Sequence, residues 1–159
     1  MKKQKKIILD VDPGHDDAVA ILLAAQAEEL DLRGITVVAG NQLLSKTLQN
    51  TLNLCSFAGI TDIPIYAGMK QPMVREQIVA EDIHGDSGLD GPDFPEPEIT
   101  AEDKHAVDFI IEEVLESEEK ITLVPTGPLT NIAMALRKEP KIKENIEEII
   151  LMGGAYGTG

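Results

Sequence analysis

The feature that most constrains this chain is the alternation of short apolar runs with segments of helical periodicity. The apolar runs predict strands at Ile7–Val11, Leu32–Val38, Ile63–Ala67, Lys120–Val124 and Glu148–Met152, and the periodic segments predict helices at Asp16–Ala27, Leu43–Ala58, Ala101–Ser117 and Leu129–Leu136. Short runs that are apolar throughout are typical of strands covered on both faces. Repeated strand–helix units therefore predict an α/β fold with an open, mostly parallel, doubly wound (Rossmann-like) sheet and right-handed crossovers.

Composition narrows the class of protein further. The 159 residues suit a single α/β domain (1–159), and because aromatic residues make up only 3%, its core must consist of Ile, Leu, Val and Ala. A net charge of −14 argues against a nucleic-acid partner, which requires clustered Lys and Arg. No stretch approaches the length of a membrane span. The single cysteine, Cys55, provides no disulfide framework, so we expect a cytoplasmic protein.

The chain ends at Gly159, shortly after its last predicted strand. A complete doubly wound domain normally covers such a strand with a further helix. We therefore expect the chain to be the N-terminal portion of a longer domain. Because bare apolar sheet surface favours association, we also expect a homo-oligomer or association with the missing C-terminal half.

Polar residues follow three of the predicted strands. Asp10 and Asp12 come at the end of the first strand, Asn41 follows the second, and Thr126 follows the strand that begins at Lys120. Ligands of open α/β sheets bind outside the carboxyl ends of the strands. A long irregular segment between residues 68 and 97, rich in Gly, Pro and Asp, is a further candidate for a functional loop.

Four aspartates fall within eight residues at the first strand-to-helix junction: Asp10, Asp12, Asp16 and Asp17. One aspartate there would be interpreted as a helix cap, but four carboxylates so close together must be relieved by protonation or by a cation. Oxygen ligands favour a hard cation, Ca²⁺ or Mg²⁺. An EF-hand is excluded, because the twelfth position counted from Asp10 is Ile21 rather than Glu.

Two other functions remain open at this point. A DxD sequence at a strand end is also found in haloacid-dehalogenase-type Mg²⁺-dependent phosphatases, in which Asp10 would be the nucleophile and Thr126 would belong to the second motif. That pattern disfavours Gly14 and gives Asp16 and Asp17 no role. The chain could instead be a non-catalytic fragment that binds a metal ion.

The sequence resembles one known family. Residues 10–18, DVDPGHDDA, are similar to the DxDPGxDDA signature of inosine–uridine-type nucleoside hydrolases. Further similar stretches follow in the same order: VAGNQ (38–42), IHGDSGL (83–89), VPTGPLTNIA (124–133) and ILMGGA (150–155). The resemblance implies the nucleoside hydrolase fold and hydrolysis of the N-glycosidic bond of ribonucleosides, giving ribose and a free base, in purine and pyrimidine salvage.

The resemblance also implies a role for individual residues. Ca²⁺ would be bound by Asp12, by Asp17 and by the backbone carbonyl of Thr126, with Asp10 supporting the site. Asp12 would act as general base towards a calcium-bound water, and the catalytic set would be Asp12, Asn41 and His84. The ribonucleoside would be bound by Asp16 at the 2′-hydroxyl, by Asn41 and Met152 at the sugar, and by His84 at the nucleobase. The family carries further ligands in its C-terminal half, so we expect this chain alone to have weak activity or none.

The other two histidines receive simpler interpretations. His15 lies in the turn before a predicted helix, and we interpret it as an exposed turn residue rather than a ligand. His105 lies early in a helical segment beside Lys104, and we interpret it as a solvated side chain.

Overall fold

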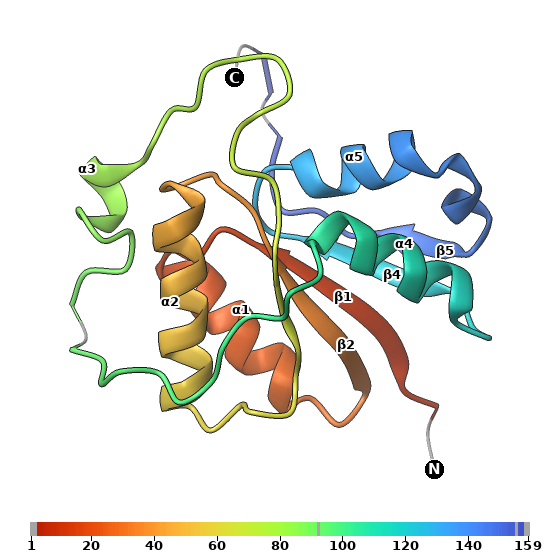
Figure 1. Cartoon of the computed structure of the whole chain (residues 1–159), viewed down its shortest axis with the longest axis horizontal. Helices are drawn as coiled ribbons and strands as arrows, with labels where there is room; N and C mark the ends of the chain where they lie inside the picture. The colour runs from red at the N-terminus through yellow and green to blue at the C-terminus, as the bar shows by residue number, and fades with distance from the viewer. Residues whose placement is uncertain (1–2, 92, 155, 158–159) are drawn as a thin grey trace.

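The computed structural model describes residues 3–91, 93–154 and 156–157, so Ala155, the last residue of the ILMGGA stretch, lies outside the described residues. In the described part of the chain, parallel strands form one sheet flanked by helices (Figure 1). The strands are β1 (Lys5–Val11), β2 (Leu30–Val37), β3 (Ile65–Ala67), β4 (Ile121–Pro125) and β5 (Ile146–Ile149). The helices are α1 (His15–Gln26), α2 (Leu44–Phe57), α3 (Glu81–His84), α4 (Ala106–Glu116), α5 (Thr130–Lys138) and the 3₁₀ helix η1 (Pro140–Glu144).

The strand order confirms the predicted doubly wound sheet. The strands lie in the order β3-β2-β1-β4-β5, and every neighbouring pair is parallel. The chain moves outward from β1 to β2 and β3, and then returns to place β4 on the other side of β1. The order therefore reverses between β1 and β4, and ligands of such sheets bind at this reversal.

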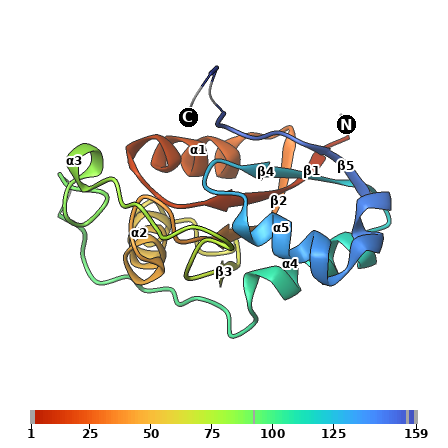
Figure 2. The same ribbon diagram turned by 90° about the horizontal axis from the view of Figure 1, so that it is seen from above.

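Helices cover both faces of the sheet and divide the core into two clusters. On one face, Leu9 of β1 packs in a cluster with Ile21 of α1. On the other face, Ile8 packs in a cluster with Ile110 of α4 and Ile132 of α5. Adjacent residues of β1 point to opposite faces because side chains alternate along a strand. Figure 2 shows α1 on the opposite side of the strands from α4 and α5.

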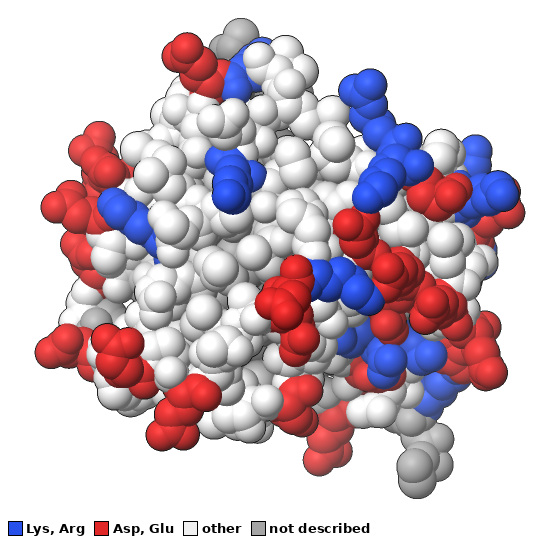
Figure 3. All heavy atoms as spheres, in the orientation of Figure 1, with Lys and Arg blue, Asp and Glu red and all other residues white. Residues whose placement is uncertain are grey.

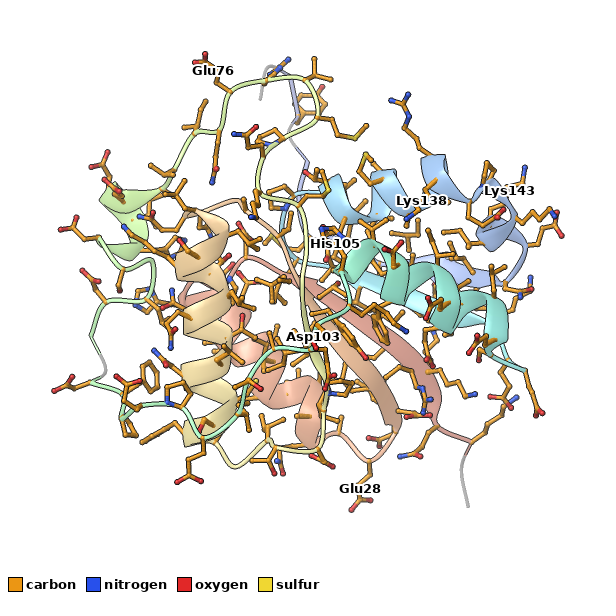
Figure 4. All side chains as sticks on the ribbon, in the orientation of Figure 1. Glu28, Glu76, Asp103, His105, Lys138 and Lys143 are labelled. Carbon is orange, nitrogen blue, oxygen red and sulfur yellow. The ribbon has the colours of Figure 1, made fainter. Side chains whose placement is uncertain are left out.

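Several predicted boundaries were wrong, and two of them have a clear physical cause. The last strand covers Ile146–Ile149 rather than Glu148–Met152, because pairing with β4 begins at Ile146 and outweighs the apolar run that favoured the later residues. The third predicted helix, expected at Ala101–Ser117, begins at Ala106 rather than Ala101 and is α4 of the structure. His105 is its cap: Nδ1 accepts a 3.2 Å hydrogen bond from the backbone N–H of Val107, so this exposed side chain also has a structural role (Figure 4).

In its described residues, 68–91 and 93–97, the predicted irregular segment contains one helical turn, α3, and is otherwise loop (Figure 1). Acidic side chains are spread around the face shown in Figure 3, with Lys and Arg intermingled among them on the side of α4 and α5. No helix in the described ranges is long and apolar enough to cross a membrane.

Candidate functional site

A cavity of about 440 Å³ opens at the carboxyl edge of the sheet. Its walls come from the segments that follow β1, β2, β4 and β5 and from α3. The lining residues include Asp12, Asp16, Asp17, Asn41, His84, Thr126 and Met152. Six of these seven residues follow the carboxyl end of a strand. The seventh, His84, comes from the irregular loop. The structure therefore brings to one place all the predicted site residues except Asp10.

Asp12 lies at the centre of this arrangement. Its carboxylate is almost fully buried, and Oδ2 accepts a 2.7 Å hydrogen bond from the backbone N–H of Asn41. The Asn41 side chain donates to the Asp12 carbonyl oxygen at 3.1 Å. Gly40 and Gly127 lie against the same carboxylate: a Cβ at Gly127 would be 2.5 Å from Oδ1, and one at Gly40 would overlap Oδ2. Because neither glycine has a side chain, there is room between them for the Asp12 carboxylate.

Asp17 is held at the N-terminus of α1. Its Oδ2 accepts a 3.3 Å hydrogen bond from the backbone N–H of Gly14, and its Oδ1 accepts one from the hydroxyl of Thr126. The free N–H groups of a helix N-terminus favour a carboxylate in this position. The contact with Thr126 joins α1 to the segment after β4, so the first and fourth strands contribute to the same wall.

Asp10 has a different environment from the other three aspartates. It is fully buried, and its Oδ1 accepts hydrogen bonds from the Thr36 hydroxyl at 2.5 Å and from Nδ2 of Asn131 at 2.8 Å. Its Oδ2 is buried without a partner among the described residues. A carboxylate enclosed in this way cannot reach a substrate, which argues against Asp10 as a phosphatase nucleophile. Sequence reasoning missed Asn131, although it lies within the matched stretch 124–133.

The remaining predicted residues lie at the mouth of the cavity. Asp16 is exposed next to the buried Asp17, and Met152 is about half exposed. The ring of His84 lies over Gly14, where an added Cβ would be 2.6 Å from Cε1. His15, interpreted from the sequence as an exposed turn residue, is exposed, but its ring also contacts His84.

Burial changes the acidity of the buried carboxyl groups. It raises the pKa of Asp10 to about 7 against the hydrogen bonds from Thr36 and Asn131. It also raises the pKa of Asp12 to about 7, and the negative charge of Asp17 adds to the effect. The pKa of Asp17 is raised for the same reason, although Thr126 and Gly14 stabilise its charged form. Ionising these groups together is unfavourable unless a positive charge is shared among them.

The donor chemistry of the cavity fits a hard divalent cation. Asp12 and Asp17 offer buried carboxylate oxygens, Asp16 and Thr126 line the same space, and Asp10 has an unpartnered oxygen beneath it. Such oxygen donors select Ca²⁺ or Mg²⁺ over softer metals. Within the described residues, however, no three His, Cys, Asp or Glu side chains already form a metal-binding group. Hydrogen bonds from backbone and hydroxyl groups occupy some of the carboxylate oxygens instead.

The fold and the cavity together define the class: a doubly wound α/β protein with an acidic cavity at the reversal of strand order. Comparison with known proteins gives the family. The model of the inosine-uridine preferring nucleoside hydrolases matches residues 7–159, and the chain belongs to this family.

Similar proteins of known name agree with this result. The chain is 59% identical over 157 residues to the pyrimidine-specific ribonucleoside hydrolase RihB of Escherichia coli O157:H7, covering 99% of this chain and 50% of that protein. It is also similar to the structure of a purine-preferring ribonucleoside hydrolase from Gardnerella vaginalis, with 41% identity and a TM-score of 0.89 over 95% of this chain and 49% of the other. An inosine-guanosine nucleoside hydrolase shows 32% identity and a TM-score of 0.87, covering 95% and 50%. The chain thus spans about half the length of the relatives it matches.

Proposed function

We propose that the cavity at the carboxyl edge of the sheet is the active site of a ribonucleoside hydrolase, which cleaves the N-glycosidic bond to give ribose and a free base. One observation carries this proposal. The Asp12 carboxylate is enclosed by Gly40 and Gly127 and held by Asn41 in a cavity that also includes His84. Membership of the nucleoside hydrolase family supports it.

The residues of the cavity suit this reaction. Asp12 has a pKa raised to about 7, so near neutral pH it can accept a proton from an attacking water. Cleavage of a glycosidic bond develops positive charge on the sugar, and the carboxylates of Asp16 and Asp17 would stabilise that charge. Asp16 would also accept hydrogen bonds from the ribose hydroxyls. Asn41 and Met152 would orient the sugar, and holding the ring in one position lowers the entropic cost of attack.

We further propose that the cofactor is Ca²⁺. Asp12, Asp17 and the backbone carbonyl of Thr126 would hold it, and Asp10 would support the site from below. A bound divalent cation lowers the pKa of a coordinated water and orients neighbouring hydroxyl groups. Mg²⁺ offers the same charge but demands a tighter octahedral geometry, so we expect Ca²⁺ to bind more strongly.

Calorimetric titration with Ca²⁺ and Mg²⁺, combined with an assay of ribose release from uridine and inosine, tests both parts of the proposal. Asp12→Ala and Asp17→Ala should each abolish calcium binding, whereas the exposed Glu28→Gln, at the far end of α1 (Figure 4), should leave it unchanged. Phosphate release from a phosphate ester in place of ribose release would favour the phosphatase alternative.

The chain covers only half of its relatives, so ribose release is also measured with the second half of the RihB relative supplied as a separate polypeptide. Calcium binding without ribose release under these conditions would identify a non-catalytic metal-binding fragment. Ribose release that requires the second half would support the proposed active site and would show that its walls come from both halves.

We also propose association through the α1 side of the sheet, either in a homo-oligomer or with a C-terminal half. Val19 and Leu23 of α1 are 64% and 68% exposed, and Ile150 is 49% exposed. Leu23 and Ile150, together with Leu9 and Val124, line an apolar hollow of about 250 Å³ next to β4, and Val19 is exposed on the same helix as Leu23. Apolar surface of this kind marks a protein interface. We further propose that the protein acts in the cytoplasm, in purine or pyrimidine salvage.

A further inference from the structure

Two histidines from distant parts of the chain meet at the edge of the cavity. Nδ1 of His15, the first residue of α1, lies 3.3 Å from Nδ1 of His84, and the ring centroids are 5.6 Å apart with a tilt of 32°. Nε2 of His15 lies 2.9 Å from the backbone carbonyl oxygen of Asp90. His15 therefore contacts both ends of the loop 84–90.

These contacts determine which ring nitrogens carry protons. A carbonyl oxygen only accepts hydrogen bonds, so Nε2 of His15 must donate to Asp90. In a neutral ring the other nitrogen, Nδ1 of His15, is then an acceptor, and the hydrogen bond between the rings must come from Nδ1–H of His84. Neutral His84 therefore keeps a lone pair at Nε2. The structure shows no hydrogen bond to this nitrogen among residues 3–91, 93–154 and 156–157.

The position of the His84 ring is constrained by its other neighbours as well. The backbone N–H of His84 donates to the carbonyl of Ala80 at 3.0 Å, and the N–H of Asp90 donates to the carbonyl of His84 at 3.1 Å. On its inner side the ring lies against Gly14, which leaves no room for a side chain. Backbone hydrogen bonds thus hold the main chain at His84, Gly14 bounds one side of its ring, and His15 is the contact that selects the tautomer of the ring.

We propose that His15 is a positioning residue that holds His84 with its Nδ1 protonated, so that Nε2 of His84 accepts a hydrogen bond from an N–H group of the nucleobase. The proposal rests on the proposed function, because it assumes that the cavity binds a nucleoside. It predicts a preference for bases with a ring N–H or an amino group at the edge facing His84. Uridine has such a group at N3, and 3-methyluridine lacks it.

The tautomer is measured by ¹⁵N NMR of the histidine rings of the chain, at a pH at which the ¹⁵N shifts are those of neutral imidazole. In the wild type we expect the His84 signals of an Nδ1–H ring. His15→Phe keeps an aromatic ring but removes both hydrogen bonds, so the His84 signals should shift towards those of an Nε2–H ring. His15→Asn supplies an acceptor oxygen close to the lost Nδ1 and should restore the wild-type pattern. His105→Phe, at the start of α4, is the matched control and should leave His84 unchanged (Figure 4).

An Nε2–H pattern for His84 in the wild type, or an unchanged pattern in His15→Phe, would overturn the proposal. Since a residue that only stabilised the loop would not affect the tautomer, rescue by His15→Asn separates a positioning role from a structural one.

Calorimetric binding of uridine and 3-methyluridine tests the role towards the ligand. One hydrogen bond corresponds to an affinity about three- to tenfold higher for uridine than for 3-methyluridine. His15→Phe should bring the two affinities closer together. Equal binding of the two nucleosides by the wild type would overturn the proposed hydrogen bond between the nucleobase and His84. If neither nucleoside binds even with the second half of the RihB relative supplied as a separate polypeptide, although His84 shows Nδ1–H, the proposed function itself fails, so the two failures are distinguishable.

Discussion

Asn131, the second residue of α5, donates a 2.8 Å hydrogen bond from Nδ2 to Oδ1 of Asp10 near the end of β1. The same amide nitrogen lies 3.2 Å from the carbonyl oxygen of Val37, and its oxygen accepts from the backbone N–H of Met69 at 2.8 Å. One buried amide therefore connects α5 to β1, to the end of β2 and to the segment after β3. It also holds the buried carboxylate beneath the cavity.

This network should contribute strongly to stability. Asn131→Ala would leave Asp10 with one hydrogen bond fewer and the N–H of Met69 without a partner. Because unsatisfied buried polar groups are costly, we expect a loss of about 2–4 kcal/mol in the free energy of unfolding, measured by urea denaturation. Gln49→Ala, on the exposed face of α2, is the control and should change it by less than about 0.5 kcal/mol. A similarly small effect of Asn131→Ala would contradict the assigned role.

Gly40→Ala should impair the site beyond its effect on folding. The new Cβ would overlap Oδ2 of Asp12, so the carboxylate has to move away from Asn41. We expect calcium affinity to fall at least tenfold in calorimetric titration, about 1.4 kcal/mol. Gly34→Ala is the matched control, because its Cβ would meet the ring of Phe109 at 2.7 Å, remote from the cavity. It should destabilise the fold and leave calcium affinity unchanged, and an equal loss of affinity in both variants would disprove a specific effect at Asp12.

The stability of the metal-free protein should decrease as pH rises from about 4 to 7. Burial raises the pKa of Asp10 and Asp12 from 3.8 to about 7, so the folded state holds their protons more tightly than the unfolded state does. This contribution is complete below pH 3.8 and is lost as pH rises through about 7. It amounts to a few kcal/mol for each of the two groups.

Urea denaturation across this pH range, with a chelator present, measures the effect. Asp10→Asn removes one titrating group while keeping the shape of the side chain, so it should flatten the pH dependence. Saturating Ca²⁺ should oppose the loss of stability near pH 7, because binding the cation favours the ionised carboxylates. Stability that rises with pH in the metal-free wild type would show that the sign of these pKa changes is wrong.

The exposed apolar surface of α1 should drive association. Leu23→Glu places a charge in the hollow between α1 and β4, so it should shift the protein towards the monomer in size-exclusion chromatography with light scattering. Phe57→Glu, at the end of α2, changes a side chain that is 67% exposed elsewhere on the surface and serves as the control. A wild type that is monomeric at high concentration would rule out the homo-oligomer and leave the C-terminal half as the partner.

The local sequence was sufficient to predict the strands, most of the helices and the edge of the sheet at which the candidate site residues gather. Strand and helix periods differ, so the alternation of apolar runs with helical patterns predicts parallel strands joined by helices. In such a sheet the carboxyl ends of the strands share one edge, and this placed Asp12, Asn41 and Thr126 together. The limits of β5 were missed, because pairing with β4 rather than hydropathy determines where it begins.

The division of roles among the four aspartates was not visible in the sequence. Asp10 and Asp12 are separated by one residue, yet Asp10 is enclosed by Thr36 and Asn131, whereas Asp12 lines the cavity. The difference arises from partners that are 26 and 121 residues away from Asp10 in the chain. The contact between His15 and His84 depends in the same way on a loop 69 residues away. The sequence by itself determined which chemical groups gather at the edge of the sheet. Only the tertiary structure decided which of them are enclosed and which face a ligand, because burial and hydrogen bonding depend on neighbours that packing brings from distant segments.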